Sequence, residues 1–233
     1  MNRIVCVGDG FAHGHIWPEW PQILRELIPA RTIETVSGIG AGNEFLVSGL
    51  LDREPDRDTV IFQWAQADRF DKIIQDQDWE DLASSDLIYG ENFYDFAGDR
   101  WWLSSASQSK EIRHYHRYYV QSRQSLRRLQ DQHKLVQGFL IGRACEYVAV
   151  STQDQDRFSR EHRFQSVRGS EVQPSPPVHL AYLEEIILPQ LRLEVDSTRL
   201  ERLRQALGDT DWQPYHPDRE EFWREMVSDL DTE

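Results

Sequence analysis

The chain has 233 residues, with 40 acidic and 26 basic side chains and a formal net charge of −14. This length fits one large domain or two small ones, and 39% hydrophobic residues with eight Trp are enough for a packed core. The acidity argues against nucleic acid as a partner, because such binding depends on clustered Lys and Arg. We therefore expect a globular protein that does not bind nucleic acid.

The apolar segments of the chain are short. None approaches the roughly 20 residues that span a bilayer, and the run at residues 3–7 is too brief for a signal peptide. We expect a soluble, cytoplasmic protein without a membrane partner. Cys6 and Cys145 are expected to be free thiols, and the absence of zinc-type Cys and His spacing predicts neither a metal nor a cofactor.

Strands and helices alternate in the first third of the chain. Residues 3–7 form an apolar run that predicts a buried strand, and Gly8–Gly10 follows as a tight turn. Pro18 marks the start of a helix whose apolar residues, from Trp20 to Ile28, recur at helical spacing. The next predicted elements are strand 32–36, glycine turn 38–42, helix 44–51 and strand 59–64.

Periodicity is lost from residue 67 to residue 109, a segment rich in Asp, Ser, Trp and Tyr. Residues 52–99 contain 14 acidic and 4 basic side chains, a local net charge of −10. We predict that 67–109 is a long, irregular insert, acidic and aromatic-rich, because it has no core-forming pattern of its own.

The second half of the chain begins with a basic helix, predicted at 110–134, with seven basic and two acidic residues. A fourth strand is predicted at 135–141, and residues 151–178 are predicted to be a polar, Pro-rich loop. The segment 179–193 is apolar enough to be buried, with a break at Pro189. The last predicted helices are 197–207, which ends at Gly208, and 220–230.

This alternation predicts an α/β fold, a flavodoxin-like doubly wound parallel sheet in a single domain over residues 1–233. In such sheets ligands bind outside the carboxyl ends of the strands, so the turns after the first three strands should meet. The polar and small residues of these turns form the predicted binding crevice. They are Asp9, Gly10, Gly40, Asn43, Gln63 and Gln66.

Four blocks of the sequence resemble, in order, those of the SGNH (GDSL-type) hydrolases. They are Gly8–Gly10, Gly40 with Asn43, the polar stretch 63–68, and His216-Pro217 ahead of the last helix. The likeness is closest to a divergent SGNH-like group frequently encoded by tailed bacteriophages, whose pattern is similar to Trp20-Pro21 and to Gln63-Trp64 followed by Arg69. This resemblance implies a three-layer α/β/α fold.

The resemblance also implies ester hydrolysis by a serine, activated by a histidine and assisted by glycine and asparagine groups that hold the oxyanion. The serine position, directly after Asp9, is Gly10 in this chain. Gly40 matches the glycine, Gln63 or Gln66 replaces the asparagine, and His216 matches the base. The aspartate three residues before that histidine is Gln213, and Asp211 is a possible substitute that would orient His216.

Loss of the nucleophile predicts a catalytically degenerate SGNH-like protein, a structural, assembly or binding component, and the resemblance to the phage-encoded group implies a bacteriophage virion as its setting. Its expected partners are other protein subunits, either copies of itself or virion components. One alternative is an active esterase or acetylhydrolase in which His216 works with a non-standard nucleophile, such as water. A second alternative is a carbohydrate-binding module, and an acyl ester or a glycan is the corresponding ligand.

Three Trp of the insert, Trp79, Trp101 and Trp102, are candidates for stacking on sugars or for a protein interface, or else for a small local core. His13 and His15, with Asp9, have the residue types of a metal site, but their spacing supplies no third and fourth ligand, so no metal is predicted. The basic residues of the long helix either pair with the acidic segment or form a solvated face. They are Arg113, Arg117, Arg127 and Arg128.

Overall fold

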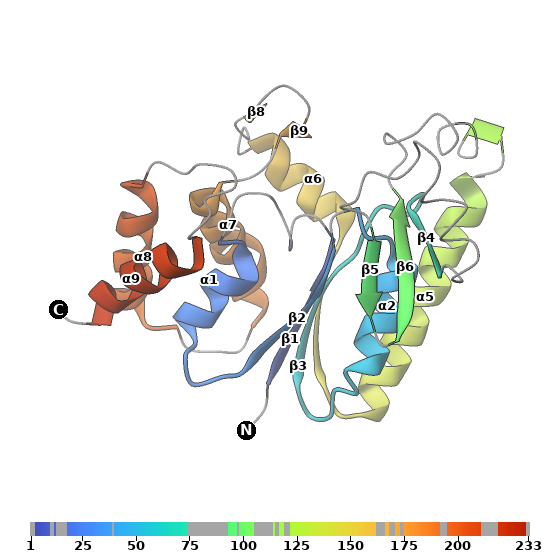
Figure 1. Cartoon of the computed structure of the whole chain (residues 1–233). Helices are drawn as coiled ribbons and strands as arrows, with labels where there is room; N and C mark the ends of the chain where they lie inside the picture. Colours follow the sequence, from blue (N-terminus) through green and yellow to red (C-terminus); the bar gives the residue numbers. More distant parts are fainter. Residues whose placement is uncertain are drawn as a thin grey trace. The chain divides into compact units, whose positions relative to one another are not determined.

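Figure 1 shows the fold of the chain as a computed structural model. The structure describes residues 3–9, 12, 18–38, 40–73, 93–96, 98–104, 114, 117–118, 122–161, 166–167, 171–172, 175–191, 195–210 and 219–231. The chain divides into two compact units. Unit 1 comprises Met1–Ile4, Gly14–Ile33 and Gln153–Glu233, and unit 2 comprises Val5–His13 and Glu34–Thr152. The single domain expected from the sequence stays a prediction.

Unit 2 is built on a four-stranded parallel sheet with the strand order β2-β1-β3-β7. The strands are β2 (Ile33–Ser37), β1 (Ile4–Gly8), β3 (Thr59–Gln63) and β7 (Glu146–Val150). β3 and β7 pair in register from Thr59 opposite Glu146 to Gln63 opposite Val150. The predicted α/β class and parallel sheet are confirmed, and the strand order is compatible with a flavodoxin-like fold.

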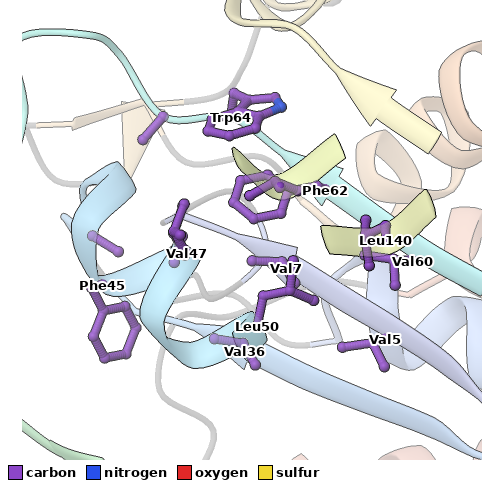
Figure 2. Packing of buried hydrophobic residues seen from close by; sticks show 14 of the residues in the cluster. Val5, Val7, Val36, Phe45, Val47, Leu50, Val60, Phe62, Trp64 and Leu140 are labelled. Atoms are coloured by element: carbon purple, nitrogen blue, oxygen red, sulfur yellow. The ribbon is translucent and has the colours of Figure 1, made fainter. Parts of the chain in front are cut away.

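Two helices, α2 (Asn43–Asp52) and α5 (Ser122–Gly142), pack on one face of this sheet over an apolar cluster (Figures 1 and 2). Alternate strand residues point to the same face, and helix residues three or four apart do the same. The cluster therefore combines strand positions with helix positions. They include Val5, Val7, Val60 and Phe62 from the strands, and Leu46, Leu50, Val136 and Leu140 from the helices.

The fourth strand lies later in the chain than predicted. Residues 135–141 belong to α5, so the predicted strand there is wrong, and the strand is β7. A short apolar run is compatible with either structure. Within it Val136 and Leu140, four residues apart, are buried while Leu135 and Ile141 are exposed, which is the pattern of a helix with one covered face.

The insert contains a second sheet, antiparallel, with the order β4-β6-β5. Its strands are β4 (Phe70–Ile73), β5 (Phe93–Phe96) and β6 (Asp99–Ser104), so the irregular structure predicted for 67–109 is wrong for these residues. β4 packs against α2, and Trp101 and Leu103 of β6 join the apolar cluster. Trp101 and Leu103 are two residues apart, as residues on one face of a strand are, and the adjacent pair Trp101-Trp102 hides this period in the sequence.

Unit 1 is mainly helical. Its helices are α1 (Trp20–Leu27), α6 (Thr152–Glu161), α7 (Pro176–Tyr182), α8 (Ser197–Gly208) and α9 (Arg219–Asp231). α7 packs against α1 and α8, and α8 packs against α9. α7 continues into a π-helix, η1 (Leu183–Ile187), and a 3₁₀-helix, η2 (Leu188–Gln190), where Pro189 interrupts the regular helix as predicted.

The prediction of a loop at 151–178 is wrong for most of the described residues in that range. This segment contains α6 and a small hairpin of β8 (Ser166–Val167) and β9 (Glu171–Val172). The first helix starts at Trp20, so Pro21 takes the N-terminal position expected of Pro18. The last two predicted helices are confirmed as α8 and α9.

Both cysteines are thiols, with Cys6 buried in β1 and Cys145 half-buried ahead of β7. Within the described ranges, no helix combines the length and the apolar character that a bilayer crossing requires.

Candidate functional site

The predicted crevice residues of unit 2 lie at the carboxyl ends of β1, β2 and β3. Asp9 directly follows β1, Gly40 lies in the turn after β2, and Gln63 is the last residue of β3. The turn after β3 adds Arg69, which leads into β4. Parallel strands bring these turns to one edge of the sheet, as the sequence predicts.

Asp9 is held by two other residues of this edge. Its Oδ2 accepts a hydrogen bond from Arg69 Nη1 at 2.7 Å, and its Oδ1 accepts one from Gln63 Nε2 at 3.2 Å. The Asp9 side chain is 9% exposed and the Arg69 side chain 23% exposed. A charge this far removed from water needs a charged or hydrogen-bonding partner, and Arg69 and Gln63 supply both.

The Arg69 guanidinium connects three turns. Besides Asp9 after β1, its Nη1 also bonds to the carbonyl oxygen of Ala41 after β2, at 3.3 Å. The backbone oxygen of Arg69 accepts from Arg128 Nη2 of α5 at 3.3 Å, and Arg128 Nε bonds to Glu44 Oε1 of α2 at 3.0 Å. Arg69 therefore fixes the carboxyl edge of the sheet, and α5 in turn holds Arg69.

Asn43, the first residue of α2, makes two bonds to one backbone unit. Its Nδ2 donates to the carbonyl oxygen of Ala65 at 3.1 Å, and its Oδ1 accepts from Ala65 N at 3.0 Å. The side chain is buried, at 3% exposed. Asn43 thus satisfies both backbone groups of a buried residue in the turn after β3, which is a structural role.

Asp71 of β4 caps the N-terminus of α2. Its Oδ1 accepts from Gly42 N at 2.8 Å and its Oδ2 from Phe45 N at 2.9 Å, two amides that a helix cannot satisfy by itself. Burial raises the pKa of Asp71 from 3.8 to about 7, although the two backbone hydrogen bonds oppose this shift. Asp71 could not be found from the sequence, because a capping residue on another strand leaves no local signal.

Backbone geometry explains why two positions at this edge, 40 and 42, are glycine. Gly40 adopts a φ of 75°, a left-handed conformation that favours glycine. A Cβ on Gly42 would lie 2.9 Å from Asp71 Oδ2 and 3.2 Å from the backbone carbon of Arg69, so only glycine fits there without a shift. The predicted glycine turn therefore allows β4 to pack closely against the start of α2.

A second polar and aromatic cluster joins Trp64, which follows β3, to His133 of α5 and Tyr147 of β7. The rings of Trp64 and His133 stack with centroids 5.0 Å apart, and Trp64 Nε1 donates to the Tyr147 hydroxyl at 3.0 Å. Burial raises the pKa of Tyr147 to about 12. This cluster could not be found from the sequence, because its members are far apart in the chain.

Trp101 is a core residue. It is 6% exposed, and its ring meets Phe45 edge to face with centroids 5.7 Å apart. The Trp101 ring is therefore buried rather than presented for stacking, and it belongs to the main apolar cluster of unit 2, not to a separate local core of the insert. Gln66, by contrast, is exposed in the turn after β3.

Several predicted site residues lie outside the described residues. They are Gly10, His13, His15, Trp79, Asp211 and His216, together with the side chain of Trp102. In the part of the chain that the structure describes, no three His, Cys, Asp or Glu side chains are grouped as metal ligands. Two of the predicted basic residues pair locally, Arg128 with Glu44 and Arg127 with Asp131.

Comparison of the chain with models of known families, with curated proteins and with solved structures found no match. The site is therefore interpreted from its geometry. Five polar side chains of the carboxyl edge bond to one another or to its backbone: Asp9, Asn43, Gln63, Arg69 and Asp71. Such bonds stabilise the turns of this edge.

Proposed function

We propose that the chain is a catalytically inactive protein of the SGNH-like type, whose carboxyl edge has become part of its scaffold. Its role is then structural or in assembly or binding, with protein subunits as partners and a bacteriophage virion as the proposed setting. The proposal combines the resemblance in sequence with the bonding at the site.

One observation carries the proposal. Gln63 is one of the two residues that, by the resemblance, replace the asparagine of the oxyanion site, and its amide nitrogen donates to Asp9 at 3.2 Å. An oxyanion hole requires donors aimed at the position where charge develops, held ready for that purpose. The Gln63 amide is instead directed at the Asp9 carboxylate, which is itself ion-paired with Arg69, and not at an oxyanion position.

Gly10 supports the same conclusion, because it offers no side-chain nucleophile at the position that follows Asp9. Removing one member of a catalytic triad leaves roughly a 10³–10⁴-fold effect over water, far below a working hydrolase. Arg69 then holds Asp9, the residue that follows β1, without the chemistry that this turn would support in an enzyme.

Hydrolysis of p-nitrophenyl acetate tests the proposal, with His216→Ala as the variant and Gln205→Ala, an exposed amide on α8, as the control. We expect all three proteins to match the rate of buffer with inert protein. Saturable turnover in the wild type and in Gln205→Ala that disappears in His216→Ala would contradict the proposal and favour the esterase alternative.

A further inference from the structure

We infer that the exposed face of α5 is the dimer interface of this protein, on which two copies pair antiparallel about a two-fold axis near Gly138. The inference rests on the proposed assembly role and names its partner, a second copy of the chain. It is carried by an uncharged surface on α5 and by opposite charges at the two ends of that surface.

The uncharged surface is the C-terminal third of α5. Residues 135–142 carry no charge, in a chain of which 28% of residues are charged. Leu135 is 53% exposed and Ile141 70% exposed, on the side of the helix away from buried Val136 and Leu140. Exposed apolar side chains in an uncharged surface are typical of the core of an interface.

Gly138 and Gly142 lie on this same surface, between Leu135 and Ile141. A Cβ added to either glycine would meet nothing within 4 Å, so no contact with the described residues requires glycine there. Glycine lowers helix stability, and Gly138 lies in the interior of the helix, where glycine is less stable than alanine. Close approach of another helix is a reason for glycine that the contacts of the described residues do not provide.

The N-terminal side of this surface is basic. Arg123, Arg127 and Lys134 are exposed on α5, and Asp131 is the acidic residue among them. Arg127 and Asp131 are paired at 3.2 Å, so the excess positive charge comes mainly from Arg123 and Lys134. Like charge along this half would repel an identical, parallel helix.

The opposite end of the surface is acidic. The loop from α2 to β3 lies beside the C-terminus of α5, where Arg57 N donates to Arg143 O at 2.9 Å (Figure 1). Asp52, Glu54 and Asp56 are exposed in this region, against one exposed basic residue, Arg57. The face of unit 2 thus runs from positive charge through an uncharged centre to negative charge.

Such a surface is complementary to itself when two copies are antiparallel. At about 1.5 Å per residue, Arg127 lies roughly 16 Å from Gly138 along the helix. Antiparallel pairing about Gly138 brings Arg127 past Gly142 of the second copy, toward its acidic loop. A two-fold dimer repeats this contact on both sides, whereas other acidic surfaces of a −14 chain repel a second copy.

Sedimentation velocity and light scattering across a concentration series test the interface. We expect the full chain to reach twice its 27.4 kDa mass, and Gly138→Lys to raise the dissociation constant about tenfold or more by placing a charge at the axis. Because lysine favours helix more than glycine does, the variant should keep its fold, which circular dichroism checks. Gly208→Lys is the matched control, an equally open helix glycine on α8.

Charge reversal tests the orientation. We expect Arg127→Glu to weaken the dimer and Arg127→Glu with Asp56→Arg to restore it, because the double variant exchanges the charges of two residues that face each other across the interface. A wild type that stays monomeric, or a dimer that Gly138→Lys leaves intact, would overturn the interface. Neither result affects the ester assay, so failure of the interface is distinguishable from failure of the proposed inactivity.

Discussion

Two neighbouring regions of unit 2 are stabilised by different physical effects. The apolar cluster beneath α2 and α5 buries side chains such as Phe62 (Figure 2). The centroids of the Phe62 and Trp64 rings are 4.2 Å apart. The carboxyl edge depends on individual bonds, such as that of Arg69 to Asp9. Apolar burial is non-directional, whereas each polar bond requires one donor and one acceptor in fixed positions.

This difference shows how a set of polar residues at the carboxyl edge can be used by the scaffold. Asn43, Gln63 and Asp71 have the residue types of a binding site, yet each is bonded to another part of the edge. Removing one of them should therefore lower stability by the value of its particular bonds. Removing an apolar side chain should lower stability by an amount that grows with the volume of the cavity it leaves.

The largest effect is expected in the apolar cluster. Phe62→Ala should lower the free energy of unfolding by about 3–5 kcal/mol, because it leaves a cavity where a fully buried ring was packed. Chemical denaturation followed by circular dichroism measures this. Leu126→Ala, at a 53% exposed position on α5, is the control and should cost less than about 1 kcal/mol. Equal losses for both variants would contradict the assignment of the core.

The next effect is expected at Asn43. Asn43→Ala should cost about 2–4 kcal/mol, because the N–H and the carbonyl of buried Ala65 both lose their partner. Gln66→Ala removes an exposed amide from the same turn and should leave the denaturation midpoint unchanged. A variant Asn43→Ala as stable as the wild type would mean that water satisfies these groups equally well.

Gly42 tests the close approach of β4 to α2. Gly42→Ala should cost about 1–3 kcal/mol, because the new Cβ lies within 3.2 Å of both Asp71 and the Arg69 backbone. Gly208→Ala, where a Cβ meets nothing within 4 Å, is the control. Thermal denaturation of the two variants gives the comparison, and a Gly42→Ala protein that melts with its control would refute the tight fit.

An effect of a different kind, a pH dependence of stability, is expected at Asp71. Its pKa is raised to about 7 in the folded protein from 3.8, so the folded state holds the proton more tightly than the unfolded state. The resulting stabilisation is present below pH 4 and is lost as the pH rises through 7. The free energy of unfolding of wild type minus that of Asp71→Asn should therefore fall between pH 4 and pH 8. A difference that rises over this interval would contradict the burial of this carboxyl.

Elements with a clear apolar period could be predicted from the sequence. β1 and β3 are short apolar runs, and α8 ends at Gly208 as its glycine indicates. The convergence of Asp9, Asn43 and Gln63 followed from the parallel sheet, because the carboxyl ends of parallel strands share an edge. These results depend on local patterns and on one general rule of topology.

Features set by contacts between distant segments could not be predicted. The 135–141 run has no property that separates helix from strand until its neighbours cover one side of it. Trp101 looks like a surface Trp in a polar segment, and only its contact with Phe45 makes it a core residue. Asp71 caps a helix that begins 28 residues earlier in the chain, at Asn43, so its partners Gly42 and Phe45 give no local sequence pattern.

The bond between Asp9 and Arg69 gives the most direct test that the carboxyl edge is a scaffold. A double-mutant cycle with Asp9→Asn and Arg69→Met, measured by chemical denaturation, isolates the interaction of the two side chains. We predict that each single variant is destabilised, that the double variant loses less than the sum, and that the coupling is about 1–3 kcal/mol. Strictly additive losses would show that the pair does not hold the turns together and would contradict the account.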